Sequence, residues 1–311
     1  MTDHNIGVDI SKSHLDVFRL EDGAAQRFDN STTGFRALTK WLGNASVARV
    51  VFEPTGAYHK AFEVELGGVL PLVKVNPLQA RRFAEAYGTR AKTDAVDARM
   101  LARMGVAFDL EPQAPQSKNM RDLRDLHVAR AGLIKDQTRL RNRAQTQDIS
   151  VLKRQTKARL TLVERQIAEL DVEIATLIAA QENTARTCDI LRSMPGVGAV
   201  SAAAMLTLMP ELGTLDRKQV ASLAGLAPIT RQSGQWQGKS FIGSGRKPLR
   251  DALYMPALVA LRWNPDLKEK YKRLRAAGKP AKVAIVAVMR NLIEIANALI
   301  KANRKWTPKA A

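Results

Sequence analysis

The chain has 311 residues, of which 45% are hydrophobic, and its formal net charge is +19. This length allows two domains, each with its own core. The single cysteine, Cys188, excludes a disulfide framework and a cysteine zinc site, and it fits a reducing compartment. We find no secretory signal at the N-terminus, and we expect no apolar segment of the ~20 residues that span a bilayer. We therefore expect a cytoplasmic protein with no membrane partner.

The positive charge is concentrated in two regions. Residues 118–165 hold 13 Lys and Arg against 5 Asp and Glu, and residues 231–311 hold 18 against 4. Such segregated charge is typical of a surface that binds a polyanion, and it favours nucleic acid as the partner. One alternative is solubility charge, which is usually mixed in sign along a chain. Another is a basic helix at a membrane surface, which needs a wide apolar face rich in Trp or Phe.

Short strands and helices follow one another in the first 110 residues. The hydrophobic pattern predicts a meander of three strands, then a helix, and then two further strands that alternate with helices. The expected strands are 4–10, 14–20, 24–29, 48–53 and 70–75, and the expected helices are 33–42, 57–66, 77–86 and 94–104. This order predicts an α/β domain with a mixed sheet flanked by helices, and it is the order of the ribonuclease-H-like fold.

A segment rich in Pro and Gln, residues 111–116, predicts a linker before a long helical region. Leucines recur every seven residues in the basic helix that follows, and this periodicity is lost over about 142–151. Six apolar residues then alternate at spacings of three and four: Leu160, Val163, Ile167, Leu170, Ile174 and Leu177. This pattern predicts a coiled-coil seam. A contact between two copies and a hairpin within one chain both stay open.

The remainder of the chain is predicted to be mainly helical. The turn PGVG (195–198) opens an apolar helix and looks like half of a helix-hairpin-helix, in which backbone amides meet phosphates. A plain helix start gives the same pattern. We expect further helices at 218–226, 248–263 and 281–302, with a polar, Gly-rich loop over 229–245 and a basic run over 268–275.

Four carboxylates stand at the ends of predicted elements. Asp9 ends the first strand, Glu53 ends the strand 48–53, and Asp94 and Asp97 open the helix 94–104. If the two strands are neighbours, the four side chains meet at one edge of the sheet. Four carboxylates with few basic partners predict a site for Mg²⁺ or Mn²⁺, which would hold a phosphodiester for cleavage. Taken singly, these residues also fit first-turn acids and turn caps.

Six motifs occur in a characteristic order along the chain. They are GVDISK (7–12), EPTG (53–56), KTDAVDAR (92–99), PGVG (195–198), GLAP (225–228) with SG (233–234), and LRDALY (249–254). In these motifs the chain resembles the transposases of the insertion-sequence one-ten family, relatives of the Piv-type DNA invertases. The resemblance spans nearly the whole chain. Its specific motifs are KTDxxDA and GLxP followed by SG after four intervening residues, whereas PGVG is common.

The resemblance implies three domains. Residues 1–110 would form a RuvC-like catalytic domain, with Asp9, Glu53, Asp94 and Asp97 as an Asp-Glu-Asp-Asp metal site. Residues 111–185 would form the linker and coiled coil. Residues 186–311 would form a mainly α-helical transposase domain with the helix-hairpin-helix-like motif and a serine loop. The resemblance also implies a bacterial, nucleoid-associated recombinase that joins target and donor DNA at sites chosen by a non-coding bridge RNA. Its assembly would be a tetramer of two dimers with composite sites.

The same resemblance matches Ser233 to a serine nucleophile. A serine hydroxyl needs a base or a metal for activation, and no histidine lies near Ser233 in the sequence, so a Ser-His-Asp triad is not expected. Delivery to a phosphate held at the metal site would activate it and would leave a phosphoserine bond to DNA. Ser240 and Ser244 are competing candidates, and Ser233 also fits a simple turn residue before Gly234.

Several basic and glycine residues are candidates for nucleic-acid contacts: Arg139, Arg141, Arg143, Gly196, Gly198, Arg246, Lys247 and Arg250. The family's Lys-x-Gly step is replaced here by GSG (243–245), which leaves open which residue there contacts phosphate. Aromatic residues are few, so we expect recognition through shape and backbone. Three other functions stay open: a RuvC-like nuclease or Holliday-junction resolvase that only hydrolyses, an actin-like ATPase or sugar kinase, and a non-catalytic nucleic-acid-binding protein.

Overall fold

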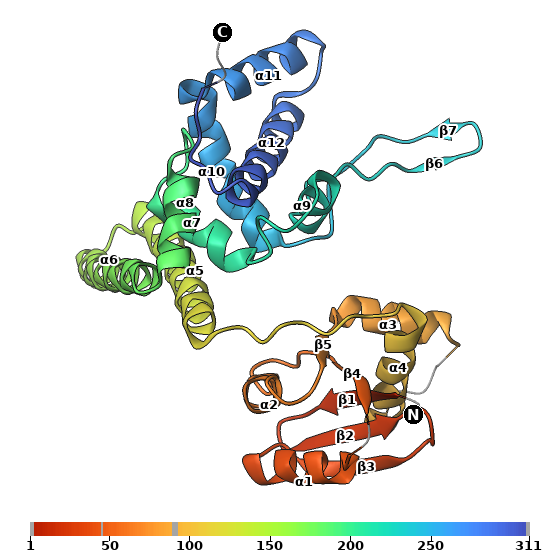
Figure 1. Cartoon of the computed structure of the whole chain (residues 1–311). Helices are drawn as coiled ribbons and strands as arrows, with labels where there is room; N and C mark the ends of the chain where they lie inside the picture. The colour runs from red at the N-terminus through yellow and green to blue at the C-terminus, as the bar shows by residue number, and fades with distance from the viewer. Residues whose placement is uncertain (1–2, 45, 89–92, 309–311) are drawn as a thin grey trace. The chain divides into compact units, whose positions relative to one another are not determined.

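The computed structural model describes residues 3–44, 46–88 and 93–308, and the chain forms two compact units, Met1–Gln116 and Ser117–Ala311 (Figure 1). Lys92 of the KTDAVDAR motif lies outside the described residues. The first unit is a mixed sheet with helices, and the second is mostly helical, as the sequence predicts.

Five strands form the sheet of the first unit in the order β3-β2-β1-β4-β5. The strands β1, β2 and β3 pair antiparallel, whereas β4 runs parallel to β1 and β5 runs parallel to β4. Their bounds are β1 His4–Ile10, β2 His14–Arg19, β3 Ala25–Asp29, β4 Val47–Phe52 and β5 Leu72–Lys74. The predicted meander and the two later strands are therefore confirmed.

Alternating side chains of the central strands divide the first unit into two cores. Ile6, Val8 and Ile10 of β1 pack with helices α1 and α2, whereas Val51 of β4 packs with α3 and α4. The helix bounds are α1 Thr32–Leu42, α2 His59–Leu66, α3 Pro77–Ala86 and α4 Asp94–Ala107. Because successive side chains of a strand point to opposite faces, the residues between those of the first core face α4.

Gly7 of β1 allows α4 to lie directly against the sheet. A Cβ atom at this position would fall 1.9 Å from the carbonyl oxygen of Ala98 and 2.6 Å from the amide nitrogen of Ala102. Both alanines are buried in the contact. The glycine of the GVDISK motif thus fixes how closely the helix that carries Asp94 and Asp97 approaches the strand that carries Asp9.

Replacing Gly7 with alanine is expected to displace α4, because backbone atoms cannot move aside as a side chain can. Overpacking of this kind costs about 1–3 kcal/mol or more in the free energy of unfolding. The displacement would carry Asp94 and Asp97 away from Asp9. Gly68→Ala is the matched control in the same unit, because its Cβ would meet nothing within 4 Å. Thermal unfolding of both variants checks the prediction, and equal melting temperatures would contradict it.

The second unit contains eight helices and a short β-hairpin within the described residues. The helices are α5 Lys118–Gln145, α6 Ser150–Ala179, α7 Glu182–Arg192, α8 Ala199–Leu208, α9 Arg217–Leu223, α10 Lys247–Trp263, α11 Pro265–Ala276 and α12 Ala281–Lys301. The hairpin strands are β6 Gln232–Ser233 and β7 Trp236–Gln237. Two of these features differ from the prediction, since the loop over 229–245 holds a hairpin and the basic run 268–275 is part of a helix.

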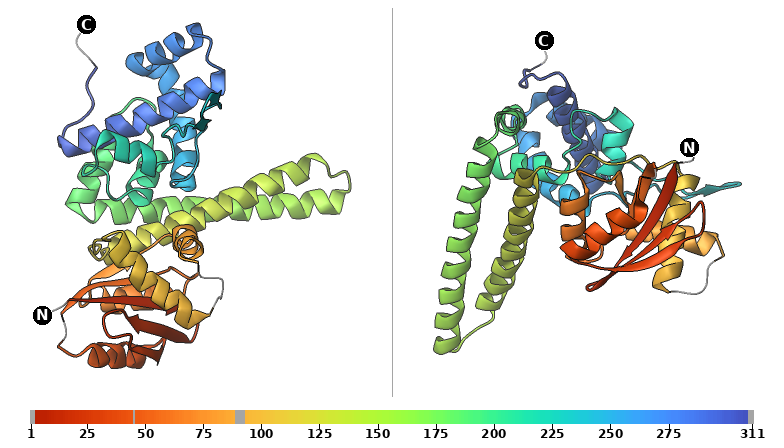
Figure 2. Two further views of the ribbon diagram at one scale, coloured as in Figure 1. Left: turned by 90° about the vertical axis from the view of Figure 1, so that its right-hand side faces the viewer. Right: turned by 60° about the horizontal axis from the view of Figure 1, so that its bottom comes forward.

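The helices α5 and α6 form the long hairpin that Figure 2 shows extending beyond the other helices of this unit. Ile167 and Ile174 of the predicted seam are buried, so the seam is used within the chain. Leu123, Ile174 and Ile178 share one core with α7, α8, α10 and α12. We expected a domain boundary at residue 185, but this shared core makes the hairpin and the C-terminal helices one unit.

Helix α12 corrects the expectation that no apolar segment approaches membrane length. Ala281–Lys301 is long and apolar enough to cross a bilayer by length and composition. Its apolar face packs into the core of the second unit, where Leu292, Ile293 and Ala296 are fully buried. Its buried Glu294 pairs with Arg217 at 2.8 Å and with Arg290 at 2.7 Å. These contacts are those of a core helix.

Candidate active site

Asp9 and Glu53 come together because β1 and β4 are parallel neighbours. Val8 of β1 pairs with Phe52 of β4. The residues that follow this pair are Asp9 in β1 and Glu53 directly after β4, so the two carboxylates are neighbours. Both alternate with side chains of the α1–α2 core, and they therefore lie on the face of the sheet that α4 covers. The sequence prediction that these two carboxylates share one edge of the sheet is confirmed by the strand pairing.

Asp94 and Asp97 lie in the first turn of α4. The Oγ1 atom of Thr93 caps this turn by accepting a hydrogen bond from the amide of Val96 at 3.4 Å. Ala98, Met100 and Leu101 bury the adjoining face of the helix against the sheet. As a result Asp9, Glu53, Asp94 and Asp97 line one cleft of about 950 Å³ in the first unit.

The pKa of Asp9 reflects both its burial and the negative charge that accumulates in this cleft. The pKa of Asp9 is raised from 3.8 to about 6, chiefly by burial and then by the nearby charges of Asp97, Asp94, Asp16 and Glu53. Like charges that gather around a partly buried carboxylate disfavour its ionised form. The cleft is therefore a place where a cation would relieve repulsion, and a perturbed carboxylate of this kind is typical of functional sites.

Two residues of this neighbourhood were not predicted. Asp16 of β2 lies directly across from Asp9, and Arg27 of β3 lies across from Asp16. Arg27 forms a bidentate ion pair with Asp16, at 3.0 and 2.9 Å, and reaches Asp94 at 3.4 Å. The expectation that the carboxylates have few basic partners is thus wrong for Asp94. The alternation of Asp16 with Leu15 and Val17 was the signal that places it on this face.

The donor set of the cleft fits a hard divalent cation in its chemistry. Four carboxylates offer only oxygen ligands, which Mg²⁺ and Mn²⁺ prefer. In the part of the chain that the structure describes, no three Asp, Glu, His or Cys side chains are grouped tightly enough to hold an ion as they stand. Holding an ion would therefore require these side chains to turn inward, and the pair between Arg27 and Asp94 would have to open or adjust.

Ser233 lies in the second unit, at the end of the β6–β7 hairpin. Its backbone pairs with Trp236, and the two-residue turn between them contains Gly234 at a φ of 55°. The residue is exposed, and Figure 1 shows the hairpin projecting from the helices of its unit. Ser240 is also exposed, whereas the carbonyl of Ser244 accepts a hydrogen bond from Arg250 at 2.9 Å. The hairpin therefore presents Ser233 at its tip.

Arg246 and Arg250, two of the predicted nucleic-acid contacts, bind groups inside the second unit. The guanidinium of Arg246 forms a bidentate ion pair with Glu211, both distances being 2.6 Å, and donates to the carbonyl of Leu208. Arg250 donates to the carbonyls of Gly225 and Ser244. These bonds join the serine loop to the helices beneath it, which gives both residues a structural role.

Replacing Arg246 with glutamine is expected to lower the free energy of unfolding by about 1–3 kcal/mol, because the half-buried Glu211 loses charge-assisted hydrogen bonds. Lys247→Gln is the adjacent control, since Lys247 is exposed and pairs with Asp251 four residues on. Such an exposed pair contributes about 0–1 kcal/mol. Thermal denaturation of the two variants checks this difference. An Arg246 variant that unfolds like the wild type would show that the pair is not structural.

Of the remaining predicted nucleic-acid contacts, the two glycines serve packing and helix capping, and the basic residues lie on the surface. A Cβ atom at Gly196 would fall 2.7 Å from the carbonyl of Pro256 in α10, so this glycine is needed for close packing. Gly198 is the N-cap residue of α8. Arg139 and Arg141 are exposed on the helical hairpin and pair with Asp136 and Glu164. Arg143 and Lys247 are exposed as well. Their contacts with nucleic acid stay predictions.

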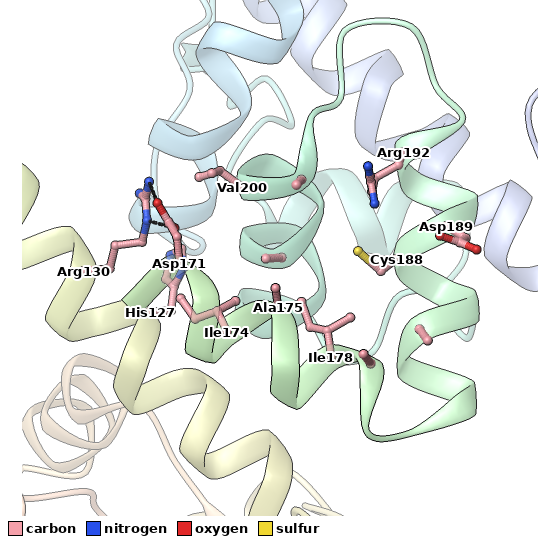
Figure 3. A pocket seen from close by; sticks show the side chains of 14 residues that line it. His127, Arg130, Asp171, Ile174, Ala175, Ile178, Cys188, Asp189, Arg192 and Val200 are labelled. Carbon is pink, nitrogen blue, oxygen red and sulfur yellow. Dashed lines mark hydrogen bonds and ion pairs between the residues drawn. The ribbon is translucent and has the colours of Figure 1, made fainter. Parts of the chain in front are cut away.

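A second cavity, of about 360 Å³, lies among α5, α6, α7 and α8 (Figure 3). Its walls include His127 and Cys188, and Arg130 forms an ion pair with Asp171 at its side. Burial raises the pKa of the Cys188 thiol, and burial lowers the pKa of His127. A thiol kept protonated is a poor nucleophile, so this cavity does not have the character of a cysteine active site.

Comparisons with known proteins identify the family. A transposase model of the IS110 DEDD type matches residues 6–154, and a model for transposases of the IS116/IS110/IS902 family matches residues 188–272. The chain is 33% identical to a pilin gene-inverting protein of Moraxella lacunata and 32% identical to that of Moraxella bovis, over 97% of each chain.

A more distant relative belongs to the insertion element IS110 of Streptomyces coelicolor. Its uncharacterized 43.6 kDa protein is 32% identical over 145 residues, which cover 46% of this chain and 35% of that protein. These matches favour the recombinase interpretation over a sugar kinase or a non-catalytic binding protein. The chain belongs to the IS110 family of transposases, and it is a DNA recombinase of that family.

Proposed function

We propose that this recombinase cuts and rejoins DNA strands through a covalent bond between Ser233 and a DNA phosphate, at sites chosen by a bridge RNA. The observation that carries the proposal is the gathering of Asp9, Glu53, Asp94 and Asp97 around one cleft, where burial and the neighbouring carboxylates raise the pKa of Asp9 to about 6. The gene-inverting names of the relatives that match 97% of the chain support strand rejoining rather than simple hydrolysis.

The first unit is proposed to be a ribonuclease-H-like domain of the RuvC type. The sheet order β3-β2-β1-β4-β5, with one antiparallel meander and two parallel strands, supports this assignment. In such an arrangement the carboxylates at the end of β1, at the end of β4 and on the last helix meet at one edge of the sheet. The cleft has this composition.

Asp9, Glu53, Asp94 and Asp97 would hold Mg²⁺ or Mn²⁺. When bound, the cation would supply charge stabilisation for the phosphate oxygens of the strand being cut. The chain's own contribution is to gather the carboxylates beside Met100, Leu101 and Met104, which line the same cleft, and to bury Asp9 in part. Arg27 balances part of the negative charge through Asp16 and Asp94.

Ser233 would provide the nucleophile. Attack of its Oγ atom on phosphorus forms a phosphoserine ester and breaks one P–O bond of the DNA backbone. The serine proton leaves and the released deoxyribose hydroxyl gains one. Attack by the hydroxyl of another strand then reverses these changes, so the energy of the phosphodiester is conserved. Support comes from the place of Ser233 at an exposed hairpin tip.

Bridge RNA and DNA would bind the basic surfaces of the second unit. The concentration of Lys and Arg in residues 118–165 and 231–311 supports a polyanion partner. A tetramer of two dimers is proposed from the family resemblance. The seam between α5 and α6 is used within the chain, so we propose that subunit contacts come from other surfaces.

The test of the proposed function is capture of a protein–DNA adduct. The purified chain, its copurified RNA, Mg²⁺ and a DNA carrying the element junction are incubated and then denatured. An alkaline-sensitive or protease-sensitive DNA species that retains protein is the expected result. Strand cleavage with no protein attached would instead favour a RuvC-like nuclease that only hydrolyses.

A further inference from the structure

The β6–β7 hairpin carries an exposed indole beside Ser233. Trp236 is the cross-strand partner of Ser233, so the two side chains project from the same face of the ribbon. The indole is 59% exposed. Its turn neighbours are Gly234 and Gln235, which provide no apolar core for a tryptophan to complete. Burial therefore does not account for a tryptophan at this position.

The indole ring of Trp236 packs against the backbone of the hairpin. A Cβ atom at Gly238 would fall 2.4 Å from Cη2 and 2.9 Å from Cζ3 of Trp236, so the far edge of the ring lies over this glycine. The amide of Gly238 donates to the carbonyl of Arg231 at 2.9 Å and ties the two strands together at that point. The ring is thus held on the ribbon while more than half of its surface stays open to a ligand.

A cation stands on the same face. Arg231 precedes Ser233 by two residues, which in an extended strand places both side chains on one side. Its guanidinium stacks over the ring of Phe241 at 4.8 Å from the centroid, and Phe241 is itself 41% exposed. An open aromatic ring and a held guanidinium on one face of a hairpin are a combination that suits single-stranded nucleic acid, through base stacking and phosphate contact.

We propose that Trp236 stacks on an unpaired DNA base next to the phosphate that Ser233 attacks, while Arg231 contacts the neighbouring phosphate. The inference rests on the proposed function, because DNA is expected at this face only if Ser233 attacks a DNA phosphate. Stacking would hold the scissile strand against the hairpin during cleavage and rejoining. Since every base presents a ring face, the contact would tolerate any base identity. It also adds an aromatic contact to the recognition through shape and backbone that the sequence predicts.

The test uses the full-length chain and a fluorescein-labelled single-stranded oligodeoxythymidylate, with binding followed by fluorescence anisotropy. Trp236→Ala is expected to raise the Kd about 5- to 100-fold, and Trp236→Phe to stay within about 3-fold of the wild type. Trp263→Ala is the matched control, since Trp263 is 72% exposed elsewhere in the same unit. It should leave the Kd unchanged.

Salt dependence separates the two contacts. Trp236→Ala should weaken binding without changing the slope of log Kd against log salt, because stacking releases no counterion. Arg231→Gln should reduce that slope by about 0.7, the value of one phosphate contact on a single strand. Unchanged binding by Trp236→Ala would overturn the proposal. So would a loss seen with an RNA oligonucleotide and not with DNA, because the face would then be an RNA site.

A second measurement keeps this inference separate from the role of Ser233. A Ser233→Ala chain is irradiated with an oligonucleotide that contains 5-bromodeoxyuridine, and the cross-linked peptide is identified by mass spectrometry. Cross-linking at Trp236 is expected, because stacking does not need the serine. Cross-linking elsewhere only would overturn the inference. An adduct that survives Ser233→Ala would instead defeat the proposed function and leave the stacking result standing.

Discussion

Replacing Asp9 with asparagine is expected to abolish DNA strand cleavage and, without added metal, to make the protein more stable. These opposite effects follow from one cause. Asp9 is partly buried among Asp97, Asp94, Asp16 and Glu53, which raises its pKa to about 6. An asparagine of the same shape removes the buried charge and the repulsion, but it also removes a carboxylate ligand.

The sign of the pH dependence follows from the direction of the pKa shift. A carboxyl whose pKa is raised in the folded state favours folding when it is protonated. Stability therefore falls as the pH rises from 3.8 through about 6 and stays low above that. One pKa unit corresponds to 1.36 kcal/mol, and solvent screening of a partly exposed group reduces the effect, so we expect a gain of about 1–2 kcal/mol for the variant at pH 7.

Thermal unfolding with and without Mg²⁺ measures both effects. The wild type should gain stability from Mg²⁺ and the Asp9→Asn variant should lose most of that gain, while its metal-free form melts higher. Glu85→Gln is a suitable control, because Glu85 lines the same cleft but pairs with Arg81 and lies outside the proposed ligand set. It should keep both activity and the response to Mg²⁺. An Asp9→Asn chain that still cleaves DNA would contradict the metal site.

The carboxylate site was predictable because each of its parts lies in a regular element. Alternation in β1 and β4 fixes the faces of Asp9 and Glu53, and parallel pairing follows from the helix between β3 and β4. Helix α3 was predicted with its observed bounds, since Asn76 and Pro77 mark its start. Local patterns of this kind determine local structure, and short connections bring the elements together.

Other features depend on register or on distant partners, which the sequence does not display. Asp16 meets Asp9 only because the turn after β1 sets that register. The pair between Arg246 and Glu211 joins residues far apart in the chain, so Arg246 looked like a surface charge. The strands β6 and β7 have two residues each, too few for alternation to be seen. Because the strands are so short, the cross-strand pairing of Ser233 with Trp236 could not be predicted from the sequence.

Replacing Ser233 with alanine is expected to eliminate the covalent protein–DNA species and to reduce strand exchange by at least about 10³-fold, as loss of a nucleophile does in other covalent enzymes. The variant should fold normally, because Ser233 is exposed and its backbone pairing with Trp236 does not need the hydroxyl. Binding of DNA should be unchanged. Adducts are detected on denaturing gels with labelled DNA, and the attached residue is located by mass spectrometry.

Ser240→Ala separates a specific nucleophile from any hydroxyl of the loop. Ser240 is exposed and lies on the same loop, but it stands beyond the hairpin strands β6 and β7. Its replacement should leave adduct formation within about 2-fold of the wild type, since a surface hydroxyl with no role contributes little. If adduct disappears in the Ser240 variant and persists in the Ser233 variant, the nucleophile is misassigned. If neither forms an adduct, the loop itself is required. The turn at Gly234, whose φ is 55°, is then the next part of the loop to test, because a nucleophile must be held at the phosphate before its hydroxyl can react.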